Sequence, residues 1–171
     1  ISYYPNGYAS KNTKNEMILS NNGSHSELST ILTKIIKLNC IDLNFSIQLN
    51  FNDIDHKAQS TTLLFYACRI NEINAVEALI ESDSIDVNIV DPETGNTPLI
   101  ESIKIHNINI AKLLIKNPKT KINIRNFAGQ SALVEAAQSF RIHKEIFYFL
   151  INDEKFNEEE SNINYAFFIS C

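Results

Sequence analysis

The chain lacks the features that mark membrane and nucleic-acid-binding proteins. No apolar run among its 171 residues approaches the roughly 20 residues that span a bilayer. Its first residues, ISYYPNGYASKNTKNE, have no apolar centre and therefore do not form a signal peptide. The formal net charge of −5 argues against nucleic acid or an anionic membrane as the main partner, because both select for a basic face. We therefore expect no membrane insertion and no nucleic-acid partner.

Cysteine is scarce and shows no pairing pattern. The three cysteines, Cys40, Cys68 and Cys171, are odd in number and have no CxxC spacing. This fits a reducing compartment better than a disulfide framework, so we expect an intracellular, cytoplasmic location. The chain does not begin with methionine, and its last residues, INYAFFISC, are similar to the start of a further helix. We therefore expect a segment of a longer protein.

No arrangement of residues in the sequence indicates catalysis. The four histidines are far apart and lack metal-ligand spacing, and two of them, His106 and His143, are expected at turns between helices. The four glycines are isolated, so no glycine-rich loop can hold a phosphate. Cys68 lies where small residues pack, and no base is placed beside it. We predict that the segment is not an enzyme and binds no metal or cofactor.

What the chain does have is an internal repeat. The segment TPLIESIKIHNINIAKLLI, which starts at Thr97, aligns with SALVEAAQSFRIHKEIFYFLI from Ser131 and with TLLFYACRINEINAVEALI from Thr62. The starts are 35 and 34 residues apart. A second motif recurs at the same spacing, because SIDVN ends at Asn88 and TKIN ends 35 residues later at Asn123. Such a period, about 33 to 34 residues, is typical of a helix-turn-helix array.

Local signals place the helices within each repeat. Thr97 is a suitable N-cap, and Pro98 suits the first helical position. Gly95 and Gly129 fall in tight turns, where a positive φ costs glycine little. Small residues recur in the first helices and apolar residues recur at helical spacing in the second. These positions are Ala67, Ser102 and Ala136 in the first helices, and Val76, Leu79, Ile80, Ile110, Leu113 and Leu114 in the second.

The period and these motifs resemble the ankyrin repeat family. The residues that carry the resemblance are Gly95 with Thr97-Pro98-Leu99, Gly129 with Ser131-Ala132-Leu133, Ala136-Ala137, and Asp86-Val87-Asn88. The resemblance implies an all-α fold, an ankyrin-like helix-turn-helix solenoid with short β-like finger loops. One departure is that Phe65, Ile100 and Val134 replace the histidine that usually follows T-P-L in this family. Apolar packing must then replace the bracing between repeats that this histidine supplies.

The resemblance divides the chain into three parts. Residues 1–13 are a loop or the tail of a preceding repeat, and residues 154–171 are an acidic connector with a partial or capping helix. Between them, residues 14–153 form the array, with repeats at about 14–53, 54–90, 91–125 and 126–153. The first repeat is degenerate, with helices expected at 15–22 and 24–39. Its finger is enlarged at 45–53, where the alternation FSIQLNF predicts a short β-hairpin.

Membership of this family would imply binding of a partner protein on the concave face, which the finger tips and the first helices form. Phe127 would either contact the partner or fold back onto its own finger. The candidate partner-binding residues, by motif position, are Arg69, Ile70, Glu93, Asn96, Lys104, Ile105, Phe127, Gln130 and Gln138.

Three functions remain open from the sequence. The first is a protein–protein interaction module or scaffold, whose partner is another protein or another domain of the same parent chain. The second is a structural spacer without a dedicated ligand. The third is the targeting arm of a larger enzyme or secreted effector whose catalytic domain lies outside this segment.

Overall fold

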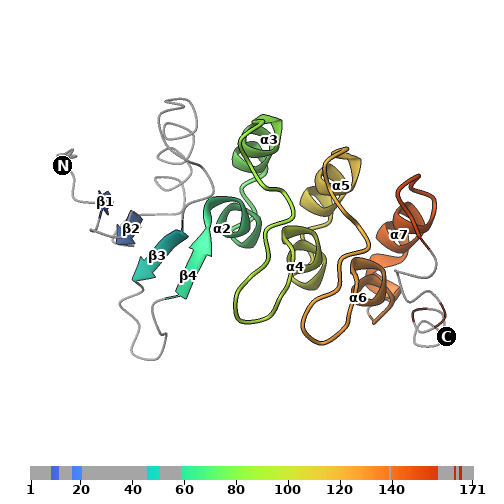
Figure 1. Ribbon diagram of the computed structural model, residues 1–171. Helices are drawn as coiled ribbons and strands as arrows, with labels where there is room; N and C mark the ends of the chain where they lie inside the picture. The colour runs from blue at the N-terminus through green and yellow to red at the C-terminus, as the bar shows by residue number, and fades with distance from the viewer. Residues whose placement is uncertain are drawn as a thin grey trace. The chain divides into compact units, whose positions relative to one another are not determined.

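The computed structural model describes residues 9–11, 17–20, 46–50, 59–138, 140–157, 164 and 166. The chain divides into two compact bodies, an N-terminal body (Ile1–Ile85) and a C-terminal body (Asp86–Cys171) (Figure 1). Within the described residues, no helix is long and apolar enough to cross a membrane.

The N-terminal body contains a four-stranded sheet with the strand order β1-β2-β3-β4. Strand β1 (Ala9–Lys11) pairs antiparallel with β2 (Met17–Ser20), and β2 pairs parallel with β3 (Ser46–Asn50). Strand β3 pairs antiparallel with β4 (Gln59–Thr62), so that Ser46 is opposite Thr62. The hairpin predicted from FSIQLNF is thus confirmed, with its second strand at Gln59–Thr62.

The helix predicted at residues 15–22 is wrong, because Met17–Ser20 forms strand β2. The apolar part of this segment is only Met-Ile-Leu, and so short a run does not distinguish a helix from a strand by its periodicity. Pairing with β1 on one side and β3 on the other supplies the backbone hydrogen bonds of β2, and this favours a strand over a helix. The second helix predicted for this repeat, at 24–39, lies outside the described residues.

One helix pair follows the sheet directly. Thr62 ends β4 and caps α2 (Leu63–Arg69), its hydroxyl accepting from the Phe65 amide at 3.4 Å. The turn to α3 (Ile73–Glu81) passes through Asn71, whose φ is 59°. The Glu72 amide then donates to the Ala67 carbonyl at 3.0 Å, which closes the turn as in a Schellman motif.

The C-terminal body consists of two further helix pairs. Helix α4 (Pro98–Lys104) packs on α5 (Ile108–Lys116), and α6 (Ala132–Gln138) packs on α7 (Phe140–Ile151). The pairs also contact each other, α4 against α6 and α5 against α7. Figure 1 shows the resulting two layers, with α4 and α6 in one and α5 and α7 in the other. Each helix therefore buries an apolar side that it could not bury alone.

The core of this body is filled by side chains from all four helices. Leu114 of α5 is completely buried, and so is Ile103 of α4. Burying one such side chain contributes about 1.5–3 kcal/mol. The small first-helix residues behave as predicted, since Ala67, Ser102 and Ala136 are all 0% exposed.

The predicted N-cap is confirmed, because the Thr97 hydroxyl accepts from the Ile100 amide at 3.2 Å and Pro98 follows it. His106 lies at the predicted turn, with φ 64° and the Asn107 amide bonded to the Ser102 carbonyl at 2.8 Å. The prediction for His143 is wrong, because this residue lies within α7. Only one residue separates α6 from α7, so the turn comes earlier in this repeat than the alignment suggests.

The three described helix pairs confirm the all-α, ankyrin-like solenoid class, with the sheet preceding them. The finger loops are β-like, as expected. Gly95 and Gly129 have φ of 71° and 75°, and a single β-bridge joins Arg125 to Ser131 within the second finger.

Candidate protein-binding surface

Each of the two fingers of the C-terminal body is organised by one polar side chain. In the first finger, the Asp91 carboxylate accepts from the Thr94 amide at 2.8 Å and from the Thr94 hydroxyl at 2.7 Å. In the second, 35 residues later, the Asn126 side-chain oxygen accepts from the Ala128 amide at 3.0 Å and from the Gln130 amide at 2.9 Å. These bonds hold each finger tip in one conformation.

The fingers are bonded to each other through Phe127. Its amide donates to the Thr94 carbonyl at 3.0 Å. Its ring lies against Gly95, where an added Cβ would come within 2.6 Å of Phe127 Cδ1. The side chain is nevertheless 70% exposed. Phe127 therefore packs on the preceding finger, not back on its own, and most of its ring faces solvent.

A series of side-chain hydrogen bonds joins the two fingers to α4. The Asn126 amide nitrogen donates to Asn96 Oδ1 at 2.9 Å, and Asn96 Nδ2 donates to Glu101 Oε2 of α4 at 2.9 Å. Asn96 is only 1% exposed, so its prediction as an exposed finger-tip contact is wrong. Because a buried amide needs hydrogen-bond partners, these contacts give Asn96 a structural role between finger and helix. We call Asn126, Asn96 and Glu101 the polar seam.

Charged groups continue from the polar seam onto α6. Burial raises the pKa of the Glu135 carboxyl above its usual value, and Lys104 lowers it. Glu101 raises the same pKa, and His106 lowers it. Glu135 therefore lies within electrostatic reach of three ionisable residues from α4 and the turn that follows it. The sequence reasoning missed this cluster, although Glu101 and Glu135 recur at the repeat spacing in PLIE and ALVE.

The remaining candidates lie where their motif positions suggest. Lys104 and Gln138 are exposed at the ends of α4 and α6, and Glu93 is exposed in the first finger. Ile105 and Gln130 are partly buried. Arg69 and Ile70 belong to the N-terminal body, where Arg69 is exposed and Ile70 caps α2.

The asparagine markers of the repeat bind the main chain of the following repeat. Asn88 donates to the Lys119 carbonyl at 2.9 Å and accepts from the Lys121 amide at 2.7 Å. Asn123 does the same one repeat later, donating to the Lys155 carbonyl at 2.8 Å. The segment up to Asn157, whose amide faces Asn123 Oδ1 at 3.5 Å, thus continues the repeat pattern. The spacing of EKFN, 34 residues after TKIN, could have revealed this.

A surface hollow of about 720 Å³ lies beside this main-chain contact. It is lined by residues 118–125 and Lys155, and we call it the basic hollow. Among the described residues that line it, four of nine are basic and none is acidic. Sequence reasoning missed it because its wall combines one loop with a residue more than 30 positions away.

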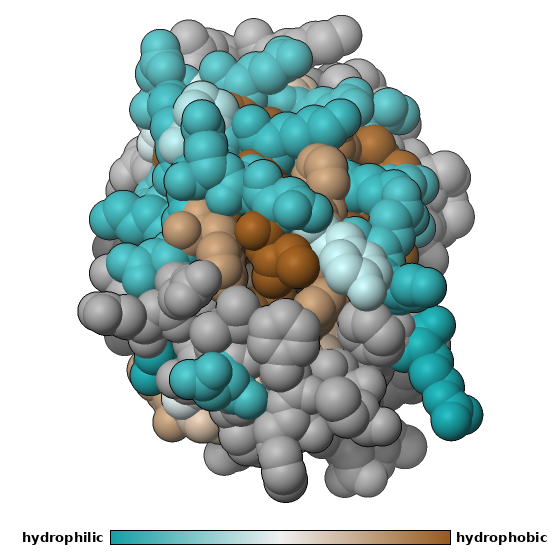
Figure 2. Space-filling model, turned by 90° about the vertical axis from the view of Figure 1, so that its right-hand side faces the viewer, coloured by the Kyte–Doolittle hydropathy of each residue, from teal (hydrophilic) through white to brown (hydrophobic). Residues whose placement is uncertain are grey.

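The α7 end of the C-terminal body shows little apolar surface. Figure 2 looks onto this side, where the described residues show a hydrophobic area bordered by hydrophilic residues. Tyr148 of α7 is 46% exposed, and its ring meets that of Phe147 edge-on, with centroids 5.9 Å apart. Scattered apolar exposure of this kind does not define a docking surface.

The described residues show no arrangement that suggests an active site. Among them, no group of three or more His, Cys, Asp or Glu side chains is placed to hold a metal ion. Cys68 is completely buried in α2.

Comparison with known proteins agrees with this architecture. The family described as "Ankyrin repeats (3 copies)" matches residues 17–126 and again residues 64–164. A search of curated proteins found no match. Among solved structures, the ankyrin repeat domain of Bcl-3, titled a unique member of the IkappaB protein family, superposes with a TM-score of 0.52 at 22% identity.

That alignment covers 64% of this chain and 48% of the Bcl-3 chain, so this chain spans about half the length of that structure. At this identity the likeness concerns the fold alone. The family matches, in contrast, together cover most of the sequence. This chain belongs to the ankyrin repeat family.

Proposed function

We propose that this chain binds a partner protein through the finger and first-helix surface of its C-terminal body, centred on Phe127. Ankyrin repeats are generally protein–protein interaction modules. We define the Phe127 surface by the candidates that the C-terminal body leaves at least partly exposed, on the face expected to be concave. These are Glu93, Lys104, Ile105, Phe127, Gln130 and Gln138.

The observation that carries this proposal is that the Phe127 ring is fixed in place by its contacts and yet exposed to solvent. Phe127 is 70% exposed, yet its backbone is bonded to Thr94 and its ring rests on Gly95. A ring that is already ordered loses little conformational freedom when a partner covers it. Aromatic residues are also among the side chains that contribute most to binding at protein interfaces.

The polar seam supports the same surface. It ties the finger to α4 by two hydrogen bonds of 2.9 Å, so the finger and the first helix present their side chains in a defined arrangement. Lys104 and Gln138, exposed at the ends of α4 and α6, are the polar members of this surface. Such a polar rim around an apolar centre is usual for interfaces that form reversibly.

Arg69 and Ile70 lie in the N-terminal body and are proposed as further partner contacts by their position in the repeat alone, separately from the Phe127 surface. They occupy the end of α2, 35 residues before Lys104 and Ile105 at the end of α4. An intracellular, cytoplasmic location fits the proposal, because the three cysteines are odd in number and lack CxxC spacing, and disulfides are rare in that compartment. The partner is another protein or another domain of the parent chain.

The test is affinity capture from a lysate of the source cells with three baits. These are the original chain, Phe127→Ala and Tyr148→Ala, each shown by circular dichroism to be equally folded. Tyr148 is the matched control, because it is an exposed aromatic residue outside the Phe127 surface. We expect one protein to be captured by the original and the Tyr148→Ala bait and to be lost with Phe127→Ala.

The captured partner is then purified and titrated against each variant. Loss of an interface aromatic should raise its Kd at least about tenfold. If all three baits capture the same proteins with equal affinity, the Phe127 surface is not the binding site. Insensitivity to all changes on this surface would favour a structural spacer.

A further inference from the structure

The charge of the chain is distributed unevenly along the sequence. Residues 102–134 contain no aspartate or glutamate but five lysines and Arg125, a formal charge of +6. The whole chain carries −5, so the remainder carries −11. A concentrated positive region on an acidic protein attracts a compact anionic ligand more than a long polyanion, which the rest of the surface would repel.

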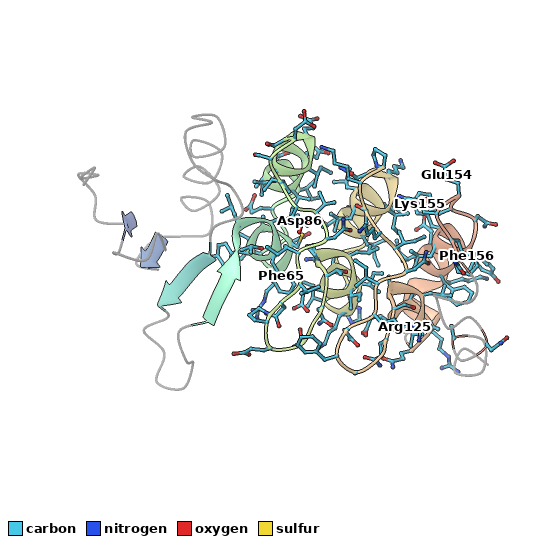
Figure 3. All side chains as sticks on the ribbon, in the orientation of Figure 1. Phe65, Asp86, Arg125, Glu154, Lys155 and Phe156 are labelled. Atoms are coloured by element: carbon cyan, nitrogen blue, oxygen red, sulfur yellow. The ribbon has the colours of Figure 1, made fainter. Side chains whose placement is uncertain are left out.

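The hollow gathers part of this charge in one place. Lys119, Lys121 and Arg125 come from the loop that leads from α5 to α6, and Lys155 comes from the segment after α7. Figure 3 labels Arg125 and Lys155. Lysine and arginine side chains in a concave wall provide the donors that carboxylates prefer.

Lys155 is a fixed part of this wall. Its ammonium group donates to the Ile115 carbonyl and, at 3.0 Å, to the Asn117 carbonyl at the end of α5. The Asp153 carboxylate lies 3.8 Å from the same nitrogen and offsets part of its charge. Lys155 therefore shapes the hollow, and the exposed cations Lys119, Lys121 and Arg125 are the groups that face a ligand from the loop.

A buried hydroxyl in the same wall lacks a hydrogen-bond partner. Thr120 is 3% exposed and lines the hollow, and its Oγ1 is bonded to no other group in the described part of the chain. Buried polar atoms are normally paired, and an unpaired one usually has a functional explanation. Because this atom is inaccessible from the surface, a ligand in the hollow bonds the exposed cations and not this hydroxyl.

We propose that the basic hollow binds an acidic segment of a partner protein. Carboxylates of the segment pair with Lys119, Lys121 and Arg125. The volume of about 720 Å³ suits a few peptide residues. Within the described part of its wall no aromatic residue is present, so that part lacks the stacking platform of single-stranded nucleic-acid sites. This inference does not depend on the Phe127 surface.

Fluorescence anisotropy tests the proposal with a labelled peptide of alternating Glu and Ser and its counterpart of alternating Gln and Ser. We expect the full chain to bind the Glu peptide and not the Gln peptide. Binding should weaken when the salt concentration rises from about 0.05 to about 0.2 M, because salt screens exposed charges. Lys119→Glu with Lys121→Glu should abolish binding, and the milder Lys121→Gln should weaken it at least threefold, roughly as expected for one lost charge pair.

Three further variants separate the hollow from general charge effects. Thr120→Val, which removes the hydroxyl without changing charge, should leave binding within about twofold, because the hydroxyl is buried and the charge pairs are kept. Lys144→Glu makes the same charge change as Lys121→Glu but on α7, outside the hollow, and should leave binding within about twofold, because it removes no lining group. Phe127→Ala should also leave it unchanged, which distinguishes this site from the Phe127 surface.

The proposal is overturned if the Glu peptide does not bind, if the Lys119/Lys121 double variant binds it as tightly as the original chain does, or if the Gln peptide binds equally well. Tighter binding of a labelled single-stranded oligonucleotide than of the Glu peptide would also overturn it and assign the hollow to nucleic acid. Circular dichroism of every variant shows whether a loss of binding is a loss of folding.

Discussion

Phe127 occupies the space beside Gly95 that a side chain would fill. An ideal Cβ on Gly95 would lie 2.6 Å from Phe127 Cδ1 and 2.8 Å from the Phe127 amide nitrogen. The absence of a side chain at residue 95 therefore allows the second finger to approach the first and Phe127 to rest on it. The glycine is needed twice, since its φ of 71° is also unfavourable for other residues.

Gly95→Ala should consequently be far more destabilising than Gly129→Ala. Gly129 has a similar φ of 75°, but nothing lies within 4 Å of an added Cβ. We expect Gly129→Ala to cost about 1 kcal/mol from its backbone conformation. Gly95→Ala should cost about 1–3 kcal/mol more, because the new methyl group meets backbone. Urea denaturation of both variants measures the difference, and equal stabilities would contradict the close approach.

Leu114→Ala should lower the free energy of unfolding by about 2–5 kcal/mol, because it empties part of the core where α5 meets its neighbours. Leu114 is completely buried, whereas its neighbour Leu113 is only partly buried. Leu113→Ala is therefore the matched control and should cost clearly less. A loss below roughly 0.5 kcal/mol for Leu114→Ala would mean that the helix faces the other way.

Asn88→Ala should cost about 1–3 kcal/mol, because it removes two hydrogen bonds to the main chain of the next repeat. Asn88→Asp keeps the acceptor for the Lys121 amide and loses the donor to the Lys119 carbonyl. Its stability should therefore lie between that of Asn88→Ala and that of the original protein. Thermal unfolding of the three proteins gives the order. If Asn88→Asp and Asn88→Ala are equally stable, the hydrogen bond from the Lys121 amide contributes nothing to stability.

Thr120→Val should raise the free energy of unfolding by about 1–3 kcal/mol, because it removes a buried hydroxyl that no described group pairs with. The change preserves the shape of the side chain. Greater stability would mean that the hydroxyl is unpaired in the folded protein. A less stable variant would show that the hydroxyl is paired in the free protein.

Glu135→Gln should stabilise the fold at neutral pH and have little effect in acid. Burial raises the pKa of Glu135 in the folded state, so folding favours its protonated form. Its favourable contribution is fully present below the pKa of the unfolded chain and is lost as the pH rises through the folded pKa. Denaturation curves of both proteins across this range should converge at the acid end. Parallel curves would assign the effect of the substitution to something other than ionisation.

Several parts of the fold follow from local chemistry and were predictable. Thr62 and Thr97 cap their helices because a threonine hydroxyl satisfies an amide of the first turn wherever such a turn forms. Strand β3 was predictable from alternation, yet β2 was not, since three apolar residues suit a helix or a strand equally.

The candidate surface was predicted less completely than the helices. Motif position correctly placed Phe127, Lys104 and Gln138 where they are exposed. It failed for Asn96, because exposure depends on the Asn126 and Glu101 side chains that close over it. The basic hollow was also missed, because Lys155 reaches it only through the packing of α7 against α5.

The sequence by itself determined the repeat period, the helix pairs and their caps, because these depend on interactions between residues a few positions apart. Tertiary structure alone decided that Phe127 rests on Gly95, that Asn96 is buried and that Thr120 lies unpaired in a basic wall. These features join residues about 30 or more positions apart, or depend on what surrounds one atom. Local patterns carry no record of such contacts, because packing of whole helices and fingers brings them about.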